Sequence, residues 1–241
     1  LYHNGGCPDT CDLWEGLHPA SDIVPTLEYA TNYYTGSAVG IIESHGSRVA
    51  EEKSPLFMYF SVQNVHSPYE MPPSYEASDY PAMWDNTYAN MLAILDSATC
   101  NVTDALKRVG LWDSTLVLWT ADNGGITLGN NYPLRGHKHD PWEGGSRVTA
   151  FLTGGFLPAH LRGTSTGQKF VHIADWYPTF VALAGADPTD PAVLSGQIHD
   201  IDGVDVWPVL TGTNLTQPRR YTPLSEVSVI DVGDTNEGEG E

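Results

Sequence analysis

One stretch of the sequence, residues 115–148, constrains the fold more than any other. It begins with an apolar, β-branched run over residues 115–120, which is typical of a buried strand. The run ends at an Asp-Asn-Gly-Gly turn, residues 122–125, and continues into a polar, glycine-rich loop. In α/β proteins, ligands bind just outside the carboxyl ends of the strands, and glycines let the backbone approach a ligand closely. We therefore predict an α/β fold with a binding site where this strand ends.

The loop after the strand also concentrates cationic side chains. Arg135, His137, Lys138 and His139 follow the acidic turn, in a chain with only 11 Lys and Arg against 30 Asp and Glu. For residues 122–125 alone, a tight turn closed by an Asx hydrogen bond is an equal alternative. The cationic cluster and the length of the loop favour a ligand site.

The composition is that of a folded protein. The chain has 241 residues, of which 41% are apolar and seven are Trp, enough for a sizeable core. Its net charge of −19 argues against binding to nucleic acid or to anionic membranes, because both require basic patches. No apolar run approaches the roughly 20 residues of a membrane span, so we expect none.

The cysteines and the first residue bear on compartment and completeness. The spacing of Cys7 and Cys11 favours a small disulfide-closed loop over a zinc site. Such a disulfide would indicate an oxidising compartment. The third cysteine is Cys100. Two sequons, at Asn101 and Asn214, permit glycosylation. The chain begins at Leu1 without a signal peptide, so we expect a fragment or a processed product.

Apolar periodicity predicts alternating helices and strands. We expect irregular structure over 1–22, helices over 26–45 and 85–109, and strands over 56–62, 115–120, 148–153 and 170–173. Asp175 and Pro178 predict the start of a further helix that ends at residues 184–185. The remaining segments are a linker over 186–203, a short apolar piece over 204–210 and a disordered acidic tail over 231–241.

The order of the middle elements predicts a βαβ unit. The run 56–62 has the length and flanks of a strand buried on both faces of a parallel sheet. A helix and a second strand follow it, so a crossover would bring both strand ends to one edge. We therefore expect His66 and Asp122 to face one cleft.

Four residues are the candidates for chemistry. Asp122 and Asn123 offer hard oxygen ligands that suit Ca²⁺ or Mg²⁺. Lys138 and the metal would neutralise the nonbridging oxygens of a sulfate or phosphate ester, and His66 would protonate the leaving oxygen. The structural alternatives are a backbone-bonded loop histidine for His66 and a solvated Lys138. Loop-surface positions are expected for His137 and His139, and a structural ion pair for Glu143 and Arg147.

Several of these segments closely resemble the sulfatases, most of all their arylsulfatase B branch (N-acetylgalactosamine-4-sulfatase-like). The resemblance is most specific in the central stretch, and it extends over about residues 27–215. The matching segments are 55–60, 65–68, 122–125, 130–138 (NNYPLRGHK), 142–148 (WEGGSRV), 172–179 and 202–207.

The resemblance implies an alkaline-phosphatase-like α/β sandwich with a mostly parallel central sheet, and Ca²⁺-dependent hydrolysis of sulfate esters. By position, Asp122 and Asn123 match calcium ligands, Lys138 the lysine that contacts the sulfate, and His66 the histidine near the leaving oxygen. The nucleophile in the family is a formylglycine within a C/S-x-P-x-R motif. The implied substrate is a small sulfate ester or a sulfated glycan, and the implied compartment is lysosomal, secreted or periplasmic.

The sequence departs from the family pattern in one respect. It contains no C/S-x-P-x-R motif and no Asp-Asp pair, and the family's upstream lysine and histidine are also absent. We expect residues 1–185 to be the C-terminal part of a catalytic domain, incomplete at its N-terminus and inactive alone, with formylglycine in the missing part. Residues 186–230 would be a linker and the start of a small C-terminal subdomain. The alternatives are a non-catalytic relic that binds anions or carbohydrate, and a related phosphatase or phosphonate hydrolase.

Overall fold

A computed structural model describes residues 13–20, 29–52, 54–72, 87–165, 169–216 and 218–219. The chain divides into two units: Leu1–Thr115 with Gly154–Phe156, and Leu116–Thr153 with Leu157–Glu241. The predicted domain boundary at residue 185 stays a prediction.

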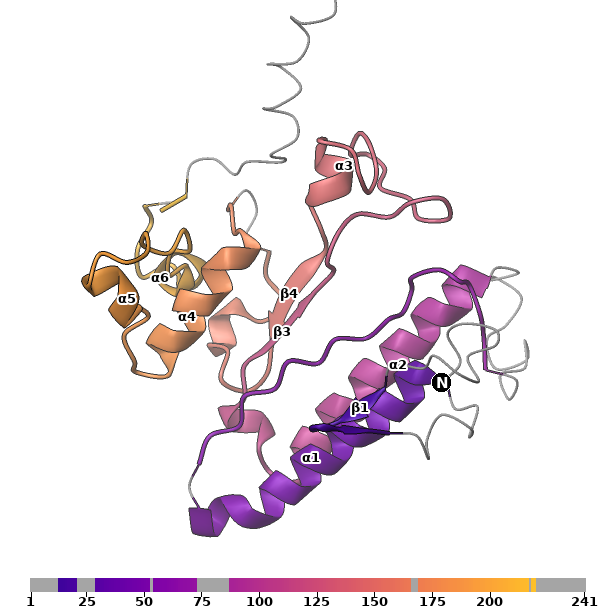
Figure 1. Cartoon of the computed structure of the whole chain (residues 1–241), viewed down its shortest axis with the longest axis horizontal. Helices are drawn as coiled ribbons and strands as arrows, with labels where there is room; N and C mark the ends of the chain where they lie inside the picture. Colours follow the sequence, from indigo (N-terminus) through magenta and orange to yellow (C-terminus); the bar gives the residue numbers. More distant parts are fainter. Residues whose placement is uncertain are drawn as a thin grey trace, which may run out of the picture. The chain divides into compact units, whose positions relative to one another are not determined.

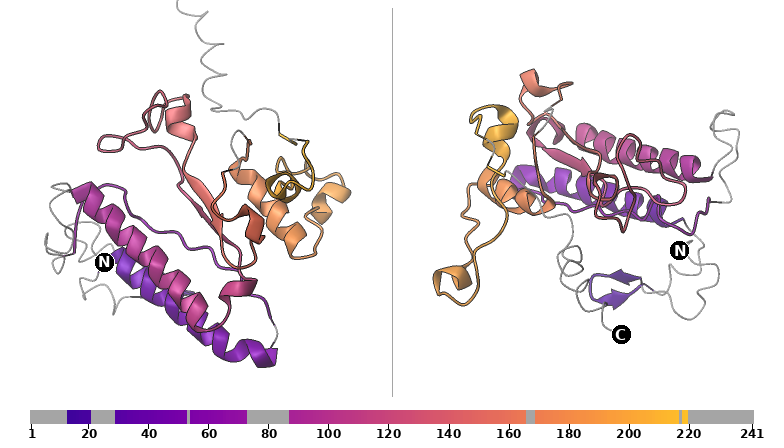
Figure 2. Two further views of the ribbon diagram at one scale, coloured as in Figure 1. Left: turned by 180° about the vertical axis from the view of Figure 1, so that it is seen from behind. Right: turned by 90° about the horizontal axis from the view of Figure 1, so that it is seen from above.

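Two long helices form the body of the first unit. Helices α1 (Ala30–Glu52) and α2 (Thr87–Arg108) pack side by side and run in the same direction (Figures 1 and 2). They pack because each buries residues three or four positions apart, which lie on one face of a helix. Those residues include Thr31, Thr35, Ala38, Ile42 and His45 of α1, and Met91, Ile94, Leu95 and Ala98 of α2. Both helices predicted from the periodicity are confirmed.

The segment predicted as a doubly buried strand is not one. Residues 54–63 lie between α1 and α2 in the sequence without belonging to a helix or a strand. Phe57 and Tyr59 are 77% and 85% exposed, whereas Met58 and Phe60 are half-buried. A strand needs a neighbour to pair its backbone N–H and C=O groups. Among the described residues the segment has no such neighbour, so only one of its faces is covered.

A short hairpin replaces part of the irregular structure expected for residues 1–22. Strands β1 (Trp14–Glu15) and β2 (His18–Pro19) pair antiparallel, and Gly16 between them has φ +61°. Glycine adopts this left-handed conformation without the steric cost that a Cβ brings, which allows so tight a turn.

The second unit is built on an antiparallel ribbon. Strands β3 (Val117–Thr120) and β4 (Ala150–Thr153) pair with Val117 opposite Thr153 and Thr120 opposite Ala150. Both predicted strands are confirmed within two residues of their expected bounds. The parallel pairing of a βαβ unit is not confirmed, since the sheets in the described part of the chain are two-stranded and antiparallel.

Short helices complete the second unit. They are α3 (Glu143–Ser146), α4 (Trp176–Leu183), α5 (Pro191–Leu194) and α6 (Trp207–Thr211) (Figure 1). The core gathers Val206, Val209 and Leu210 against Leu152 of β4 and Trp176 of α4. The helix predicted before residue 184 and the apolar piece over 204–210 therefore both contribute to packing. Residues 170–172 form no strand, and Ile173–Asp175 is a 3₁₀ turn, which corrects the prediction for 170–173.

Asp175 does not cap α4 as predicted. Its backbone is helical and its carboxylate makes no capping bond to that helix. The side chain instead turns back, accepts from the His172 backbone N at 2.8 Å and pairs with Arg219 at 2.6 Å. Asp175 is fully buried, and its bond to His172 N is part of a capping box at the start of the 3₁₀ turn Ile173–Asp175, which leads into α4.

Two predictions lie outside the described residues: the Cys7–Cys11 disulfide and the acidic tail over 231–241. Cys100 is exposed and has no disulfide partner in the part of the chain that the structure describes. Among the described residues, no helix is both long and apolar enough to cross a bilayer.

Candidate functional site

The ribbon β3–β4 carries the candidate loop at its open end (Figure 1). Two backbone hydrogen bonds close the base of the loop: Ala121 N donates to Thr149 O at 3.1 Å, and Gly124 N donates to Gly145 O at 2.9 Å. The polar turn that follows β3 is therefore joined directly to the short helix α3. This junction holds the two ends of the loop together.

Glycines let the loop fold tightly onto itself. A Cβ on Gly124 would collide with the carbonyl oxygen of Gly144, and one on Gly144 would collide with that of Gly136. A Cβ on Gly125 would lie 2.7 Å from the Cα of Gly129. These approaches are closer than any side chain permits. The glycines at these positions are thus needed for packing within the loop.

Asn131 joins the two halves of the loop, a role that the sequence analysis missed. Its Oδ1 accepts from Gly125 N at 2.8 Å, while its Nδ2 donates to Gly125 O at 2.9 Å and to Gly136 O at 3.2 Å. An asparagine between glycine-rich segments is a usable signal, because its amide can replace missing backbone partners. The adjacent Asn130-Asn131 pair carried that signal.

Asp122 and Asn123 lie directly after β3, as predicted. Asp122 Oδ1 accepts from Asn123 N at 2.8 Å, which is the Asx-type bond of the structural alternative. Asn123 Nδ2 donates to Gly124 O at 2.9 Å. Each side chain keeps one oxygen, Asp122 Oδ2 and Asn123 Oδ1, without a hydrogen-bond partner among the described residues. Turn and ligand roles are therefore compatible.

These two oxygens fit part of a hard-cation site. Ca²⁺ takes six to eight oxygen ligands, so a complete site needs more donors than this turn offers. No cluster of three or more His, Cys, Asp or Glu suited to a metal occurs among the described residues. The turn fits a divalent cation as a contributor of ligands, not as a whole site.

Lys138 lies on the same loop as the two candidate ligands. Its backbone N donates to Gly125 O at 3.3 Å, which ties it to the turn after β3. The side chain is half-buried, and its ammonium group has neither an ion pair nor a hydrogen bond to any described residue. A lysine that is partly desolvated and unpaired is suited to bind an anion.

His66 belongs to the first unit, whereas Asp122, Asn123 and Lys138 belong to the second. Its Nδ1 lies 2.6 Å from Ser67 O. A carbonyl can only accept, so Nδ1 carries the hydrogen and Nε2 is the position that can take up or release a proton. The expected cleft shared with Asp122 stays a prediction.

Asn64 positions the chain around His66. Its Oδ1 accepts from Tyr29 Oη and from Thr31 Oγ1, both at 2.8 Å, and its Nδ2 donates to Met91 O at 2.8 Å. His66 N in turn donates to Gln63 O at 2.8 Å. Burial raises the pKa of the Tyr29 phenol, which therefore stays a neutral donor to Asn64 near neutral pH.

The other charged residues of the loop hold it in shape. The Arg135 guanidinium lies 3.9 Å from the centre of the Trp142 ring, and Arg147 pairs with Glu143 at 3.5 Å, as predicted. His137 and His139 are exposed, also as predicted. Since Arg135 faces Trp142, Lys138 is the better candidate for an anion contact.

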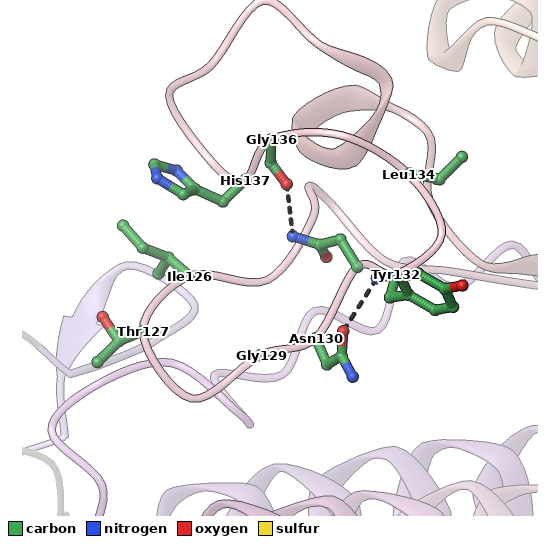
Figure 3. A pocket seen from close by; sticks show the side chains of 9 residues that line it. Ile126, Thr127, Gly129, Asn130, Tyr132, Leu134, Gly136 and His137 are labelled. Carbon is green, nitrogen blue, oxygen red and sulfur yellow. Dashed lines mark hydrogen bonds between the residues drawn. The ribbon is translucent and has the colours of Figure 1, made fainter.

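A pocket of about 360 Å³ opens on the loop. In Figure 3, Ile126, Thr127 and His137 lie on one side of it, and Tyr132 and Leu134 lie on the other. Its residues directly precede Lys138 in the sequence. The loop that carries the candidate anion contact therefore also carries a pocket.

Comparisons with known proteins match most of the chain. The sequence model named Sulfatase matches residues 4–186. Mouse arylsulfatase J is 36% identical over 222 residues, covering 88% of this chain and 34% of the relative. Mouse N-acetylgalactosamine-6-sulfatase is 24% identical over 210 residues, covering 84% of this chain and 37% of the relative. The chain thus spans about a third of the length of these curated relatives.

A solved structure, Ps i-CgsB in complex with k-i-k-neocarrahexaose, matches with a TM-score of 0.65 and 29% sequence identity. The match covers 78% of this chain and 39% of that chain. It supports an α/β fold of the alkaline-phosphatase type, although the extensive sheet predicted from the sequence is not seen among the described residues.

Proposed function

Because this chain belongs to the sulfatase family, we propose that it supplies part of a site that hydrolyses sulfate esters with the help of a divalent cation, preferably Ca²⁺. One observation carries the proposal. The Lys138 ammonium and one oxygen each of Asp122 and Asn123, which have no partner among the described residues, lie on a single hydrogen-bonded loop.

The chemistry follows from these groups. The Lys138 ammonium would bind one nonbridging oxygen of the sulfate and stabilise the negative charge that develops during transfer. Asp122 Oδ2 and Asn123 Oδ1 would hold the cation together with further ligands. The cation would supply Lewis-acid neutralisation of the sulfate oxygens.

In this proposal His66 protonates the leaving oxygen through Nε2. Its hydrogen bond from Nδ1 to Ser67 O fixes which ring nitrogen is available for that step. The role itself comes from the family resemblance, since His66 and Lys138 belong to different units.

Sulfated glycans are the favoured substrate class. The similar proteins include an N-acetylgalactosamine-6-sulfatase and a protein solved with k-i-k-neocarrahexaose. Residues 123–139, which surround the candidate anion contact, contain no Asp or Glu in a chain that has 30. A polyanionic glycan would therefore meet little repulsion from this stretch of the loop. By family resemblance we also propose a lysosomal, secreted or periplasmic location.

The decisive experiment needs a protein that also carries a nucleophile, because the C/S-x-P-x-R motif is not in this sequence. We would express a gene product that contains both this sequence and such a motif, and measure turnover of 4-nitrophenyl sulfate. We expect Lys138→Ala to lower kcat/KM by about 10²–10³-fold, the loss typical of removing one group that stabilises transition-state charge.

Lys107→Ala is the matched control, since Lys107 is an exposed lysine paired with Asp104 at 3.1 Å. Lys107→Ala should leave turnover unchanged. A calcium chelator should abolish the activity of the unmutated protein and of Lys107→Ala. Equal activity of Lys138→Ala and the unmutated protein would contradict the assigned role. Preferential turnover of 4-nitrophenyl phosphate would favour the phosphatase alternative, and binding of sulfate without turnover would favour the relic.

A further inference from the structure

The loop that carries Lys138 also presents an aromatic ring, Tyr132, that packing within the loop does not use. Tyr132 is 87% exposed, although its backbone N is held by Asn130 Oδ1 at 2.9 Å. Because Asn130 uses its oxygen for this bond, its Nδ2 projects without a hydrogen-bond partner among the described residues. In Figure 3 the amide of Asn130 and the ring of Tyr132 extend from neighbouring points of the loop. We name these two side chains the tyrosine platform.

The backbone beneath the tyrosine platform is held in place. Asn131 binds Gly125 and Gly136 on either side of it, and Gly129 packs against Gly125. An exposed aromatic side chain on a fixed backbone loses little conformational entropy when a ligand covers it. The adjoining pocket of about 360 Å³ lies in the size range of small-molecule sites.

The chemistry of the tyrosine platform selects a class of ligand. An aromatic ring offers apolar area and a π face, which the C–H face of a pyranose ring can cover. The Asn130 amide donates a hydrogen bond, which a sugar hydroxyl can accept and a bare aryl ring cannot. Lys138, a few residues further along the loop, offers charge for a sulfate group.

We propose that Tyr132 and Asn130 bind the sugar ring of a sulfated glycan and set the preference for glycan over simple aryl sulfates. This inference rests on the proposed function, because it takes Lys138 as the sulfate contact. It adds the residues that recognise the alcohol part of the ester. Tyr132 covers the apolar face of the sugar, and Asn130 Nδ2 donates to one of its hydroxyls.

The test is a titration of the 241-residue chain, followed by ¹H–¹⁵N NMR, with galactose 6-sulfate, methyl galactoside and 4-nitrophenyl sulfate. Galactose is chosen because its axial hydroxyl leaves one face rich in C–H groups. We expect Tyr132→Ala to raise the Kd for galactose 6-sulfate about tenfold, equivalent to ~1.4 kcal/mol. Tyr132→Phe should change the Kd less than about twofold, because it keeps the ring.

Asn130→Asp isolates the donor. The carboxylate still accepts from Tyr132 N, but it cannot donate. Its negative charge also repels both sulfated probes, so the neutral methyl galactoside reports the lost donor, and its binding should weaken. Tyr177→Ala is the control, since Tyr177 is an exposed tyrosine of the same unit that does not line the pocket. It should bind every probe like the unmutated chain, and the spectra themselves report whether each variant is folded.

The inference is overturned if the unmutated chain binds neither sugar, or if Tyr132→Ala binds galactose 6-sulfate as tightly as the unmutated chain does. Unchanged binding of methyl galactoside by Asn130→Asp would also overturn it. The proposed function fails differently, through the absence of sulfate-ester turnover in the longer protein. Binding of methyl galactoside, which has no sulfate, would remain dependent on Tyr132 in that case.

Discussion

At the scale of single residues, the most buried charge of the described chain lies away from the candidate site. Burial alone would raise the pKa of Asp175. Hydrogen bonds from Arg219 and from the backbone of His172 and Val204 outweigh that effect, and the pKa is lowered. Arg219 also donates to Asp202 O at 2.7 Å. The pair thus joins three separate parts of the second unit: residues 172–175, residues 202–204 and Arg219.

This geometry makes Arg219→Ala strongly destabilising. The substitution leaves a fully buried carboxylate without its partner, which costs about 3–5 kcal/mol in comparable buried pairs. We expect that loss in the free energy of unfolding at pH 7, measured by urea denaturation with tryptophan fluorescence. Arg147→Ala, which removes an ion pair between exposed side chains, should cost less than about 1 kcal/mol. Similar losses in the two variants would contradict the assignment.

The same pair predicts how stability depends on pH. The pKa of Asp175 is lower in the folded protein than in the unfolded chain, so its contribution is complete above the unfolded value of about 3.9. The contribution is lost as the pH falls through the lower, folded pKa. The difference between the unmutated chain and Arg219→Ala should therefore shrink below about pH 4. A difference that grows on acidification would exclude this linkage.

At the scale of elements, α1 offers two glycines in opposite situations. A Cβ on Gly40 would meet no atom within 4 Å, whereas one on Gly46 would lie 2.6 Å from Val109 Cβ. Alanine is favoured over glycine inside a helix by about 1 kcal/mol where space allows. Contact with Val109, just after α2, therefore decides whether a glycine-to-alanine substitution in α1 raises or lowers the free energy of unfolding.

We expect Gly40→Ala to raise the free energy of unfolding by about 1 kcal/mol. Gly46→Ala should lower it by about 1–3 kcal/mol, because the added methyl group overpacks the helix contact. Urea denaturation of both variants, followed by circular dichroism at 222 nm, measures the two changes against the unmutated chain. The packing described here would be wrong if both substitutions stabilised the protein equally.

The helices and strands also show which parts of the secondary structure the local sequence pattern can predict. Spacing and composition predict helices α1 and α2 and strands β3 and β4. In each of them the pattern of apolar residues within the element shows which face is buried. The segment 54–63 and residues 170–172 have apolar composition too, yet neither is a strand in the described structure. A strand requires a hydrogen-bonding neighbour, and no local pattern can supply one.

At the scale of the whole molecule, the 241-residue chain contains Lys138, the proposed sulfate contact, but no C/S-x-P-x-R motif. We expect the purified chain to show no turnover of 4-nitrophenyl sulfate, even with Ca²⁺ and in the unmutated form. A continuous assay at enzyme concentrations sufficient to detect a single turnover would measure this. Activity in this assay would sink the assignment of the nucleophile to the C/S-x-P-x-R motif.

The sequence by itself determined the family, the two long helices, the strand that leads to Asp122 and the loop that carries Lys138. These features are local, because apolar periodicity, turn residues and an ordered motif can each be recognised from residues that are close together in the sequence. Only the tertiary structure decided that Asn131 closes the loop, that Asp175 pairs with Arg219 and that Tyr132 stands exposed. The physical reason is that a hydrogen bond, an ion pair or an exposed face depends on which distant residues come near, and burial sets the energy of each contact.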